Sequence, residues 1–362
     1  MKNNNILIIC TSLNMGGAEK KAVWLANQLS KDFKVYFFSL KSSGVLSTNL
    51  NNDVIIKNFN LVRSKNVFSK LYYVFVGWFR LVKTIKDEEI QTVISFLFHS
   101  NLYAKLAKIF TLKKFTHIIA VRSDRLSKRG SNQNILRMFV FKYFVIDKKS
   151  KIIFNSTAGF EKFSLKKKYS QKIIYNSPEN NPDFNLEKTN KFVFVGRLDE
   201  LKNTTELVKS IHYLNQKGYS VELDIFGKGP NYNFLEKYIL ENNLKNSISL
   251  MGLQPEIANN LYSYQSLILT STHEGFPNVI TEAMNSKINC ISTKVGDVEY
   301  LLSNNRGILI EGFDYLSIST AIESYLKLNK EEKDKMAEDS YEFVNKNLKE
   351  EEILSQWISL II

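Results

Sequence analysis

The sequence predicts an α/β protein of two successive doubly wound domains, each a parallel sheet with helices on both faces. Apolar runs of strand length alternate with segments of helical periodicity along the whole chain, which is typical of this class. The alternation breaks once, in a polar stretch around residues 173–184 that contains two prolines. A length of 362 residues also fits two domains. We therefore expect domains at residues 1–176 and 177–362, and we allow the last helix to pack back onto the first.

The predicted strands are short apolar runs, and the predicted helices have apolar side chains at helical spacing. In the first domain the strands are residues 5–11, 34–40, 54–59, 92–98, 117–121 and 151–155, and the helices are residues 17–29, 70–86, 101–110 and 134–146. In the second domain the strands are residues 191–195, 221–226, 247–251, 267–270, 288–293 and 307–310. Its helices are residues 205–217, 232–242 and 256–264, one around Glu282, and the segment after residue 310.

The composition predicts a cytoplasmic protein. Hydrophobic residues make up 44% of the chain, an ordinary share for a globular protein. No run approaches the roughly 18 apolar residues that span a bilayer, and the first apolar run, residues 6–10, is too short for a secretion signal. Cys10 and Cys290 both lie in strand-like runs, so we expect buried, reduced thiols.

The net charge of +13 is unevenly divided. Residues 1–176 contain 31 Lys and Arg against 9 Asp and Glu, a formal charge of +22. Residues 177–362 contain 18 against 27, a formal charge of −9. A Lys-rich proteome would explain many lysines, but not why the acidic residues lie in the other half. The asymmetry indicates a polyanionic or membrane partner for the first domain alone.

Residues 271–284 carry two glutamates around a Gly-Phe-Pro turn. The segment follows a predicted strand, so Glu274 should lie at the carboxyl end of the sheet, where open α/β sheets bind ligands. Pro277 fits the first position of a helix, whose N-terminal amides can receive phosphate oxygens. Glu282 lies about a turn and a half further along that helix. One glutamate is thus placed for the sugar end, and the other for the ribose end, of a nucleotide sugar.

A second motif follows the first strand of the second domain. Gly196 at the strand end lets the backbone approach a ligand, and Arg197 and Lys202 supply positive charge beside it. Arginine offers a planar fork to phosphate oxygens and lysine a point charge. A diphosphate leaving group needs this compensation as its charge develops in the transition state.

The first domain has two weaker candidate sites. Gly16 and Gly17 follow the first strand and open a helix, which allows a tight turn and close backbone approach. The pattern differs from the Gly-x-Gly-x-x-Gly fingerprint, so it does not favour NAD. His99 ends the predicted strand 92–98, although a lone histidine in such a place is more often a capping or packing residue.

Together these motifs resemble the retaining glycosyltransferases of family 4 type, also called glycosyltransferases group 1. The resemblance covers nearly the whole chain, and the glutamate pair around Gly-Phe-Pro-Asn is its most specific part. It implies two facing Rossmann-like domains with a cleft between them, the GT-B fold. One departure is Asp297, where family members often have the second glycine of a Gly-Gly-x-x-Glu turn, and this leaves the role of that turn open.

The resemblance also implies roles for individual residues. Arg197 and Lys202 would hold the nucleotide diphosphate. Glu274 would bind hydroxyls of the donor sugar, and Glu282 those of the ribose. His99 would line the sugar and acceptor side, which completes a catalytic set of His99, Arg197, Lys202 and Glu274. The residues that would border the diphosphate, the sugar or the nucleobase are Gly16, Gly17, Gly196, Gly227, Leu253, Phe276, Pro277, Asn278 and Val279.

The expected reaction moves a hexose or N-acetylhexosamine from a nucleoside diphosphate sugar to an acceptor hydroxyl, with retained anomeric configuration. We expect UDP as the nucleotide. No Asp-x-Asp triplet stands at a strand end, so we expect no divalent metal and assign charge compensation to Arg197 and Lys202. The leaving diphosphate would itself receive the proton of the acceptor.

The basic first domain suggests that the acceptor is lipid-linked, as in capsule, O-antigen or glycan-precursor assembly. Residues 69–83 combine aromatic residues with Lys and Arg, a pattern that fits either a membrane-interface helix or a core helix. We expect peripheral attachment to anionic lipid on the inner face of a bacterial plasma membrane. A sugar-nucleotide epimerase of the same architecture is the alternative. A nucleic-acid-binding protein is ranked last, because it would not need the glutamate pair.

Overall fold

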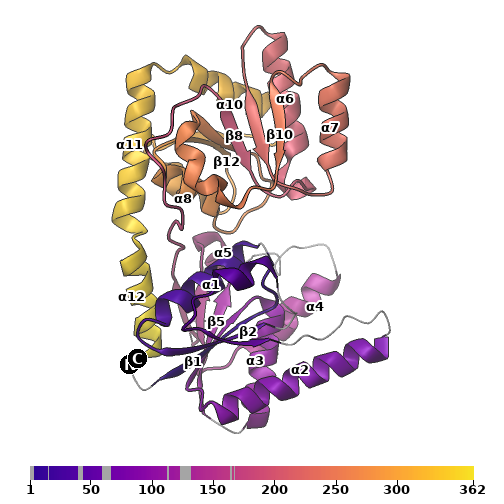
Figure 1. Ribbon diagram of the computed structural model, residues 1–362, viewed down its shortest axis with the longest axis vertical. Coiled ribbons are helices and arrows are strands. Elements are labelled where there is room, and N and C mark those ends of the chain that lie inside the picture. Colours follow the sequence, from indigo (N-terminus) through magenta and orange to yellow (C-terminus); the bar gives the residue numbers. More distant parts are fainter. Residues whose placement is uncertain are drawn as a thin grey trace. The chain divides into compact units, whose positions relative to one another are not determined.

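The computed structural model describes residues 4–14, 16–39, 44–58, 67–111, 114–122, 132–163, 165–166 and 168–362. The chain divides into two compact units (Figure 1). The first comprises Met1–Asn176 together with Glu351–Ile362, and the second comprises Ser177–Glu350. The C-terminal segment therefore lies in the first unit.

The first unit is built on a parallel sheet of seven strands. The strands are β1 (Asn5–Cys10), β2 (Lys34–Ser39), β3 (Ile55–Asn58), β4 (Thr92–Phe96), β5 (Thr116–Val121), β6 (Lys151–Phe154) and β7 (Ser170–Ile173). Their order is β3-β2-β1-β4-β5-β6-β7, so the direction of winding reverses between β1 and β4. Such a switch point creates a crevice at the carboxyl ends of the two strands.

Helices cover both faces of this sheet. They are α1 (Gly17–Leu29), η1 (Val45–Asn49), α2 (Val67–Asp87), α3 (Phe98–Thr111), α4 (Asn132–Val140), the π-helical turn η3 (Phe141–Val145), α5 (Thr157–Phe163) and α12 (Glu350–Ile361). Buried side chains of α1 and α12 pack on one face. Those of α2, α3, η3 and α5 pack on the other.

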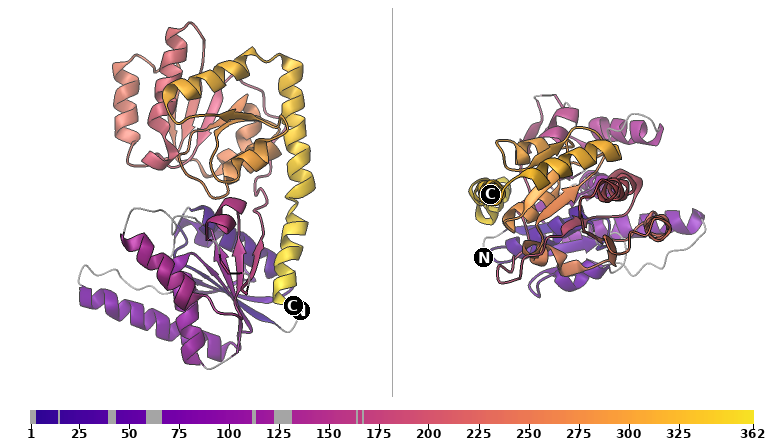
Figure 2. Two further views of the ribbon diagram at one scale, coloured as in Figure 1. Left: turned by 180° about the vertical axis from the view of Figure 1, so that it is seen from behind. Right: turned by 90° about the horizontal axis from the view of Figure 1, so that it is seen from above.

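The C-terminal helix α12 is part of the core of the first unit (Figure 2). The indole of Trp357 stacks against Phe96 on β4 with ring centroids 6.3 Å apart. Lys151 Nζ donates to the Leu360 carbonyl at 2.7 Å, and Asn4 Nδ2 donates to the Ile361 carbonyl at 3.2 Å. The end of the chain is thus held to both β6 and the segment that leads into β1.

The second unit has a parallel sheet of six strands. The strands are β8 (Phe192–Val195), β9 (Leu223–Phe226), β10 (Ile248–Gly252), β11 (Ser266–Leu269), β12 (Asn289–Thr293) and β13 (Ile308–Ile310). The helices are η4 (Glu200–Lys202), α6 (Thr204–Gln216), α7 (Tyr232–Glu241), η5 (Pro255–Ser263), α8 (Asn278–Asn285), α9 (Val298–Leu302), α10 (Tyr315–Lys327) and α11 (Lys330–Asn347). The strand order β10-β9-β8-β11-β12-β13 places the reversal between β8 and β11.

The predicted fold class, two doubly wound parallel sheets with helices, is confirmed. Every predicted strand has a counterpart, whereas β7, α5 and α9 were not expected. Cys10 and Cys290 are buried and free, as predicted. Within the described ranges, none of the helices has the length and apolar character needed to cross a membrane.

Candidate functional site in the second unit

The candidate donor site lies where the second sheet reverses its winding. The loop after β8 leads into η4 and carries Lys202, and the loop after β11 carries Glu274. Because β8 and β11 are parallel neighbours, their carboxyl ends meet at one edge of the sheet. Open α/β sheets bind ligands at such a point.

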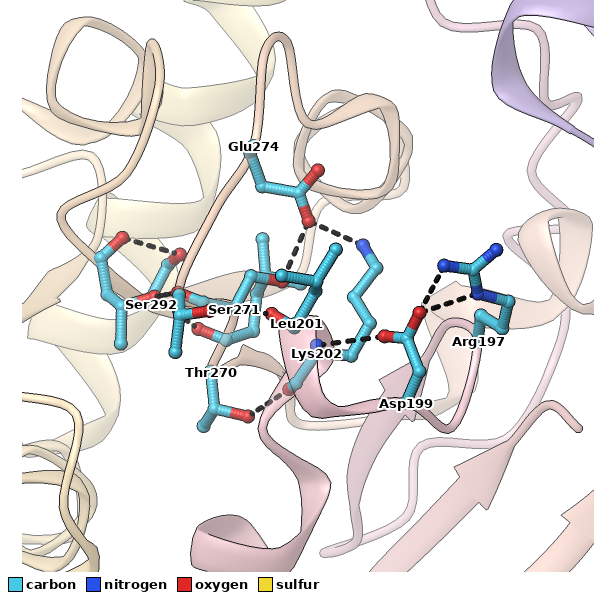
Figure 3. A network of polar contacts seen from close by, with 11 residues as sticks. Arg197, Asp199, Leu201, Lys202, Thr270, Ser271, Glu274 and Ser292 are labelled. Carbon is cyan, nitrogen blue, oxygen red and sulfur yellow. Dashed lines mark hydrogen bonds and ion pairs between the residues drawn. The ribbon is translucent and has the colours of Figure 1, made fainter. Parts of the chain in front are cut away.

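Lys202 and Glu274 meet across this switch point (Figure 3). Lys202 Nζ lies 2.5 Å from Glu274 Oε1, and the two side chains are only 23% and 15% exposed. Ser271 Oγ donates to the same carboxylate oxygen at 2.7 Å. Oε2 takes no part in either bond, and an ammonium group has three N–H donors. The pair therefore places a cation beside a carboxylate oxygen that can accept a hydrogen bond from a hydroxyl group.

Arg197 is held by the carboxylate of Asp199. Arg197 Nε donates to Asp199 Oδ2 at 2.7 Å, and Nη2 donates to the same oxygen. The other carboxylate oxygen, Oδ1, accepts from the Lys202 backbone N–H at 3.2 Å and so caps η4. Asp199 thus links the Arg197 guanidinium, which is 57% exposed, to the backbone of Lys202. Both predicted diphosphate cations belong to one network (Figure 3).

Threonine side chains and backbone hold the two loops together. Thr270 Oγ1 donates to the Lys202 carbonyl at 3.0 Å, and Thr272 N donates to the Leu201 carbonyl at 2.8 Å. On the other side, Thr293 Oγ1 at the end of β12 donates to the Ser271 carbonyl at 2.6 Å. The positions of Lys202 and Glu274 are therefore fixed by backbone and side-chain bonds from three strands.

Glycines let the loops after β8 and β9 approach closely. Gly227 has φ +148°, and a Cβ placed there would overlap the Gly196 carbonyl oxygen. The Leu198 amide donates to the Lys228 carbonyl at 3.1 Å, which pairs the two loops. Leu253 follows β10 and is exposed. The predicted residues Gly196 and Gly227 are thus brought together, and Leu253 lies after the next strand at the same edge.

The turn after Glu274 leads into α8, with one correction to its expected start. Pro277 has ψ 88° and is the residue before the helix, which begins at Asn278 rather than at the proline. Helix ends are uncertain by a residue in sequence patterns because the capping residue is only half helical. Phe276 is buried, Val279 is half-buried, and Glu282 is half-buried one turn along α8.

The turn with the unusual Asp297 supports the glutamate loop. Gly296 has φ +56°, and a Cβ there would overlap the Gly275 carbonyl oxygen. The Asp297 N–H donates to that carbonyl at 3.3 Å. The first glycine of the turn is therefore required for close packing, while Asp297 stands before the first residue of α9.

Candidate residues in the first unit

Gly16 and Gly17 lie at the switch point of the first sheet, after β1. Gly16 precedes α1 in an extended conformation, and a Cβ there would overlap the carboxylate of Glu19. Ser12 Oγ donates to Glu19 Oε1 at 3.3 Å. Glu19 is thus folded back onto the loop, and the lack of a side chain at Gly16 makes room for it. Residue 15 of this loop lies outside the described residues.

His99 lies after β4, the other strand of the same switch point, but not at a strand end as predicted. The strand ends at Phe96, and His99 is an exposed residue in the first turn of α3. Leu97 between them has φ +71°, a left-handed conformation that a β-strand cannot continue through and that an apolar pattern does not reveal. Thr11 Oγ1 and Ser100 Oγ, 3.3 Å apart, join the loops after β1 and β4.

A buried polar cluster anchors the turn that carries His99. Ser95 Oγ on β4 donates to Asn101 Oδ1 at 2.7 Å and lies 2.8 Å from His117 Nε2 on β5. Because a hydroxyl has one hydrogen, Ser95 accepts from the Nε2–H of a neutral imidazole. Burial, reinforced by the charge of Lys108, lowers the pKa of His117 to about 3. The cluster is therefore neutral at physiological pH.

Several contacts of the site were not anticipated. Asp199 and Ser271 orient the predicted Arg197 and Glu274, and neither was singled out from the sequence. A signal existed for Asp199, since Asp three residues before Lys202 at a turn is a typical N-cap. Ser271 has no comparable signal, because its contact depends on how the turn after β11 folds back.

Similarity to known proteins

Residues 176–343, nearly the whole second unit, match the family model of glycosyl transferases group 1. The predicted resemblance to this family is therefore confirmed for the second unit. The matched range includes Arg197, Lys202 and Glu274, as well as all strands of the second sheet.

Two curated relatives come from Campylobacter jejuni. The chain is 27% identical over 361 residues, 98% of each chain, to the α-1,4-N-acetyl-D-galactosaminyltransferase of GalNAc-α-(1→4)-GalNAc-α-(1→3)-diNAcBac-PP-undecaprenol. It is 26% identical over 324 residues to the N-acetylgalactosamine-N,N′-diacetylbacillosaminyl-diphospho-undecaprenol 4-α-N-acetylgalactosaminyltransferase, covering 84% of this chain and 85% of the relative.

The fold is also similar to that of solved structures. The crystal structure of HepE from Anabaena in complex with UDP and glucose has a TM-score of 0.80 and 17% identity, over 98% of each chain. At this identity the likeness concerns the fold alone. The predicted GT-B fold class, with two Rossmann-like domains, is confirmed.

Proposed function

We propose that this glycosyltransferase moves an N-acetylhexosamine from a UDP-sugar to a polyprenyl-diphosphate-linked glycan, with retention of anomeric configuration. The observation that carries the proposal is the meeting of Lys202 and Glu274 at the switch point of the second sheet. In a nucleoside diphosphate sugar, an anionic diphosphate is joined to a sugar that carries hydroxyl groups. A cation can bind the diphosphate, and a neighbouring carboxylate can accept hydrogen bonds from the sugar hydroxyls.

The cations would hold the diphosphate and compensate its charge as it leaves. Arg197 offers a guanidinium fork and Lys202 a point charge. Asp199 holds the Arg197 guanidinium and the backbone N–H of Lys202. Preorganised charge of this kind stabilises a leaving group without further rearrangement. We propose that the two cations perform this role without a divalent metal. Transfer that continues in excess EDTA supports this, and loss of transfer that Mg²⁺ restores would refute it.

Glu274 would bind hydroxyls of the donor sugar through Oε2, since Oε1 is engaged by Lys202 and Ser271. Glu282, one turn along α8, would accept from the ribose hydroxyls. The phosphate and sugar would meet the backbone at the start of α8, whose positive dipole end favours an anion. The proton of the acceptor hydroxyl would pass to the departing diphosphate.

The donor and acceptor are proposed from the relatives together with the charge of the chain. Both Campylobacter jejuni relatives are named as α-linking N-acetylgalactosaminyltransferases of undecaprenyl-diphosphate-linked glycans. An α-linked product made from an α-linked UDP-sugar implies retention. The formal charge of +22 on residues 1–176 fits an acceptor bearing a diphosphate at an anionic membrane surface.

The reaction is tested by incubating the protein with UDP-N-acetylgalactosamine and a diphosphate-linked glycan acceptor. We expect UDP release that depends on acceptor, and an α-anomeric signal in the NMR spectrum of the product. Release of UDP without acceptor, or conversion of the donor into another sugar nucleotide, would instead identify a hydrolase or an epimerase. A β-linked product would refute retention alone.

A further inference from the structure

One surface of the first unit is apolar although it faces solvent. Among the described residues of this unit, nine large hydrophobic side chains on α2, α3, α4 and η3 are exposed. They are Tyr72, Phe75, Phe79, Ile109, Phe110, Leu136, Phe139, Tyr143 and Phe144. Contiguous exposed apolar patches on a soluble protein commonly mark an interaction surface. We call this surface the aromatic face.

Helix α2 contributes one stripe of the aromatic face. Tyr72, Phe75 and Phe79 are spaced by three and four residues, so they lie on one side of the helix, and they are 64%, 61% and 57% exposed. Lys83 and Lys86 continue the same spacing and are exposed. The opposite side packs into the core through Leu81 and Ile85. The described side chains of α2 thus contribute to both the core and the surface.

The stripe continues onto the neighbouring helices. Trp78 on α2 lies between Phe75 at 5.8 Å and Phe110 of α3 at 4.9 Å, measured between ring centroids. A second stripe on α4 and η3 includes Phe139 and Tyr143, whose rings are 4.7 Å apart. These helices cover the same face of the first sheet. In Figures 1 and 2 the N-terminal half of α2 extends beyond the edge of that sheet.

The charge around the aromatic face is mainly positive. Residues 67–86, 98–111 and 132–146 contain eight Lys and Arg and no Asp or Glu. Carboxylates lie only at the ends of these segments, where Asp87 is the last residue of α2 and Asp147 pairs with Lys105 and Lys108 of α3. A protein interface of ordinary composition would mix both signs, and a second copy of this face would be repelled by its own charge. Aromatic side chains flanked by lysines match the interface of an anionic bilayer, where rings enter the headgroup region and ammonium groups meet lipid phosphates.

We propose that the aromatic face docks on the surface of an anionic lipid bilayer, with Phe75 and Phe79 entering the headgroup region. The inference deepens the proposed function, since docking would bring a lipid-linked acceptor within reach. Vesicle binding is nevertheless measured without donor, acceptor or transfer. The two proposals can therefore fail separately: a protein without transferase activity would still bind vesicles if the aromatic face is a membrane surface.

The test is flotation of the full chain with vesicles of phosphatidylcholine with and without phosphatidylglycerol. We expect wild type to float with phosphatidylglycerol vesicles and the double variant Phe75→Ser, Phe79→Ser to bind about tenfold or more weakly. The matched control is Phe234→Ser on α7 of the second unit, a phenylalanine that is 52% exposed and should not matter. Wild type that does not float, or a double variant that floats as well as wild type, overturns the proposal.

Two further measurements keep the outcome unambiguous. Wild type already contains three tryptophans, so quenching by brominated lipids is measured as the increase over wild type. It should rise in Phe79→Trp and not in Phe234→Trp, and an equal change in both would overturn the proposal. Sedimentation velocity without lipid should show the same mass for wild type and the double variant. A wild-type dimer that the double variant loses would make the aromatic face an interface between copies and would also overturn it.

Discussion

Lys202 Nζ lies 2.5 Å from Glu274 Oε1, joining the loops that follow β8 and β11. These strands flank the reversal of the second sheet, so the contact brings together residues 72 positions apart in the sequence. If both side chains bind one donor molecule, substitutions should weaken its transfer far more than they weaken the fold.

Replacing Glu274 by Ala should lower kcat/KM for transfer by about 10²- to 10³-fold, the usual cost of removing a group that binds the reacting centre. Glu274→Gln should lose less, because its amide oxygen still accepts from Ser271 Oγ. Steady-state transfer assays measure both. The control is Glu241→Ala, which removes an exposed carboxylate from α7 and should leave the rate unchanged. A fully active Glu274→Ala enzyme is incompatible with the assignment.

Replacing Arg197 by Lys should weaken UDP binding by about tenfold, and Arg197→Ala by about 100-fold, because lysine keeps the charge but lacks the planar fork. Isothermal titration calorimetry with UDP measures both constants. Lys237→Ala, which breaks an exposed ion pair with Glu241, is the matched control and should bind UDP as wild type does. An Arg197→Lys variant that binds UDP as tightly as wild type would show that the fork geometry is unimportant.

Replacing Gly227 by Ala should reduce both stability and donor binding. The new Cβ would overlap the Gly196 carbonyl oxygen, so the loops after β8 and β9 would have to separate. Gly218→Ala is a useful comparison, because Gly218 also has a positive φ of +90° but no atom lies within 4 Å of its added Cβ. Both variants carry backbone strain, and only Gly227→Ala should lose UDP affinity in calorimetry. If both variants lose UDP affinity equally, the loss is caused by backbone strain and not by separation of the two loops.

The buried His117 predicts a pH dependence of stability. The folded chain keeps its imidazole neutral because burial lowers the pKa to about 3, whereas the unfolded chain takes up a proton below the ordinary value of 6.5. The free energy of unfolding should therefore fall as the pH drops below 6.5, by up to about 1.4 kcal/mol per pH unit. Urea unfolding at pH 7 and pH 5 should show this loss in wild type. His117→Gln should lack that component, and an equal loss in the variant would contradict the assignment.

Replacing Trp357 by Ala should destabilise the first unit by about 3–5 kcal/mol, the usual cost of truncating a fully buried aromatic side chain. Trp357 packs with Phe96 in the core beneath α12. Urea unfolding would measure the loss of stability, and limited proteolysis would show whether it lies in the first unit. Tyr300→Ala, an exposed aromatic residue of the second unit, should cost much less. A stable Trp357→Ala protein would mean that α12 is dispensable for the first unit.

The parallel sheets could be predicted because their strands are continuous apolar runs, as in β4 and β11. Edge strand β7 was missed because its four residues are partly polar and alternate between exposed and half-buried. The end of β4 could not be located, because the left-handed conformation of Leu97 has no signature in an apolar pattern. The last helix was allowed to pack back onto the first domain, and only the tertiary structure shows that it contacts β4.

Residue types at strand ends predicted which side chains lie at one edge of the second sheet, since the carboxyl edge of a parallel sheet brings such residues together. The sequence placed Arg197, Lys202 and Glu274 at that edge but not in contact. The contact depends on Asp199 and Ser271, which are oriented by η4 and by the turn after β11. Pairings of this kind require loop geometry that local patterns do not encode.

We propose that Lys202 holds the diphosphate while Glu274 holds the sugar of the same donor. Equilibrium titrations of UDP and of UDP-N-acetylgalactosamine into wild type, Lys202→Ala and Glu274→Ala test it most directly. We expect Lys202→Ala to bind both ligands about tenfold or more weakly. We expect Glu274→Ala to bind UDP at least as tightly as wild type but to lose the extra affinity that the sugar provides. Unchanged UDP affinity in Lys202→Ala, or unchanged UDP-sugar affinity in Glu274→Ala, would contradict it.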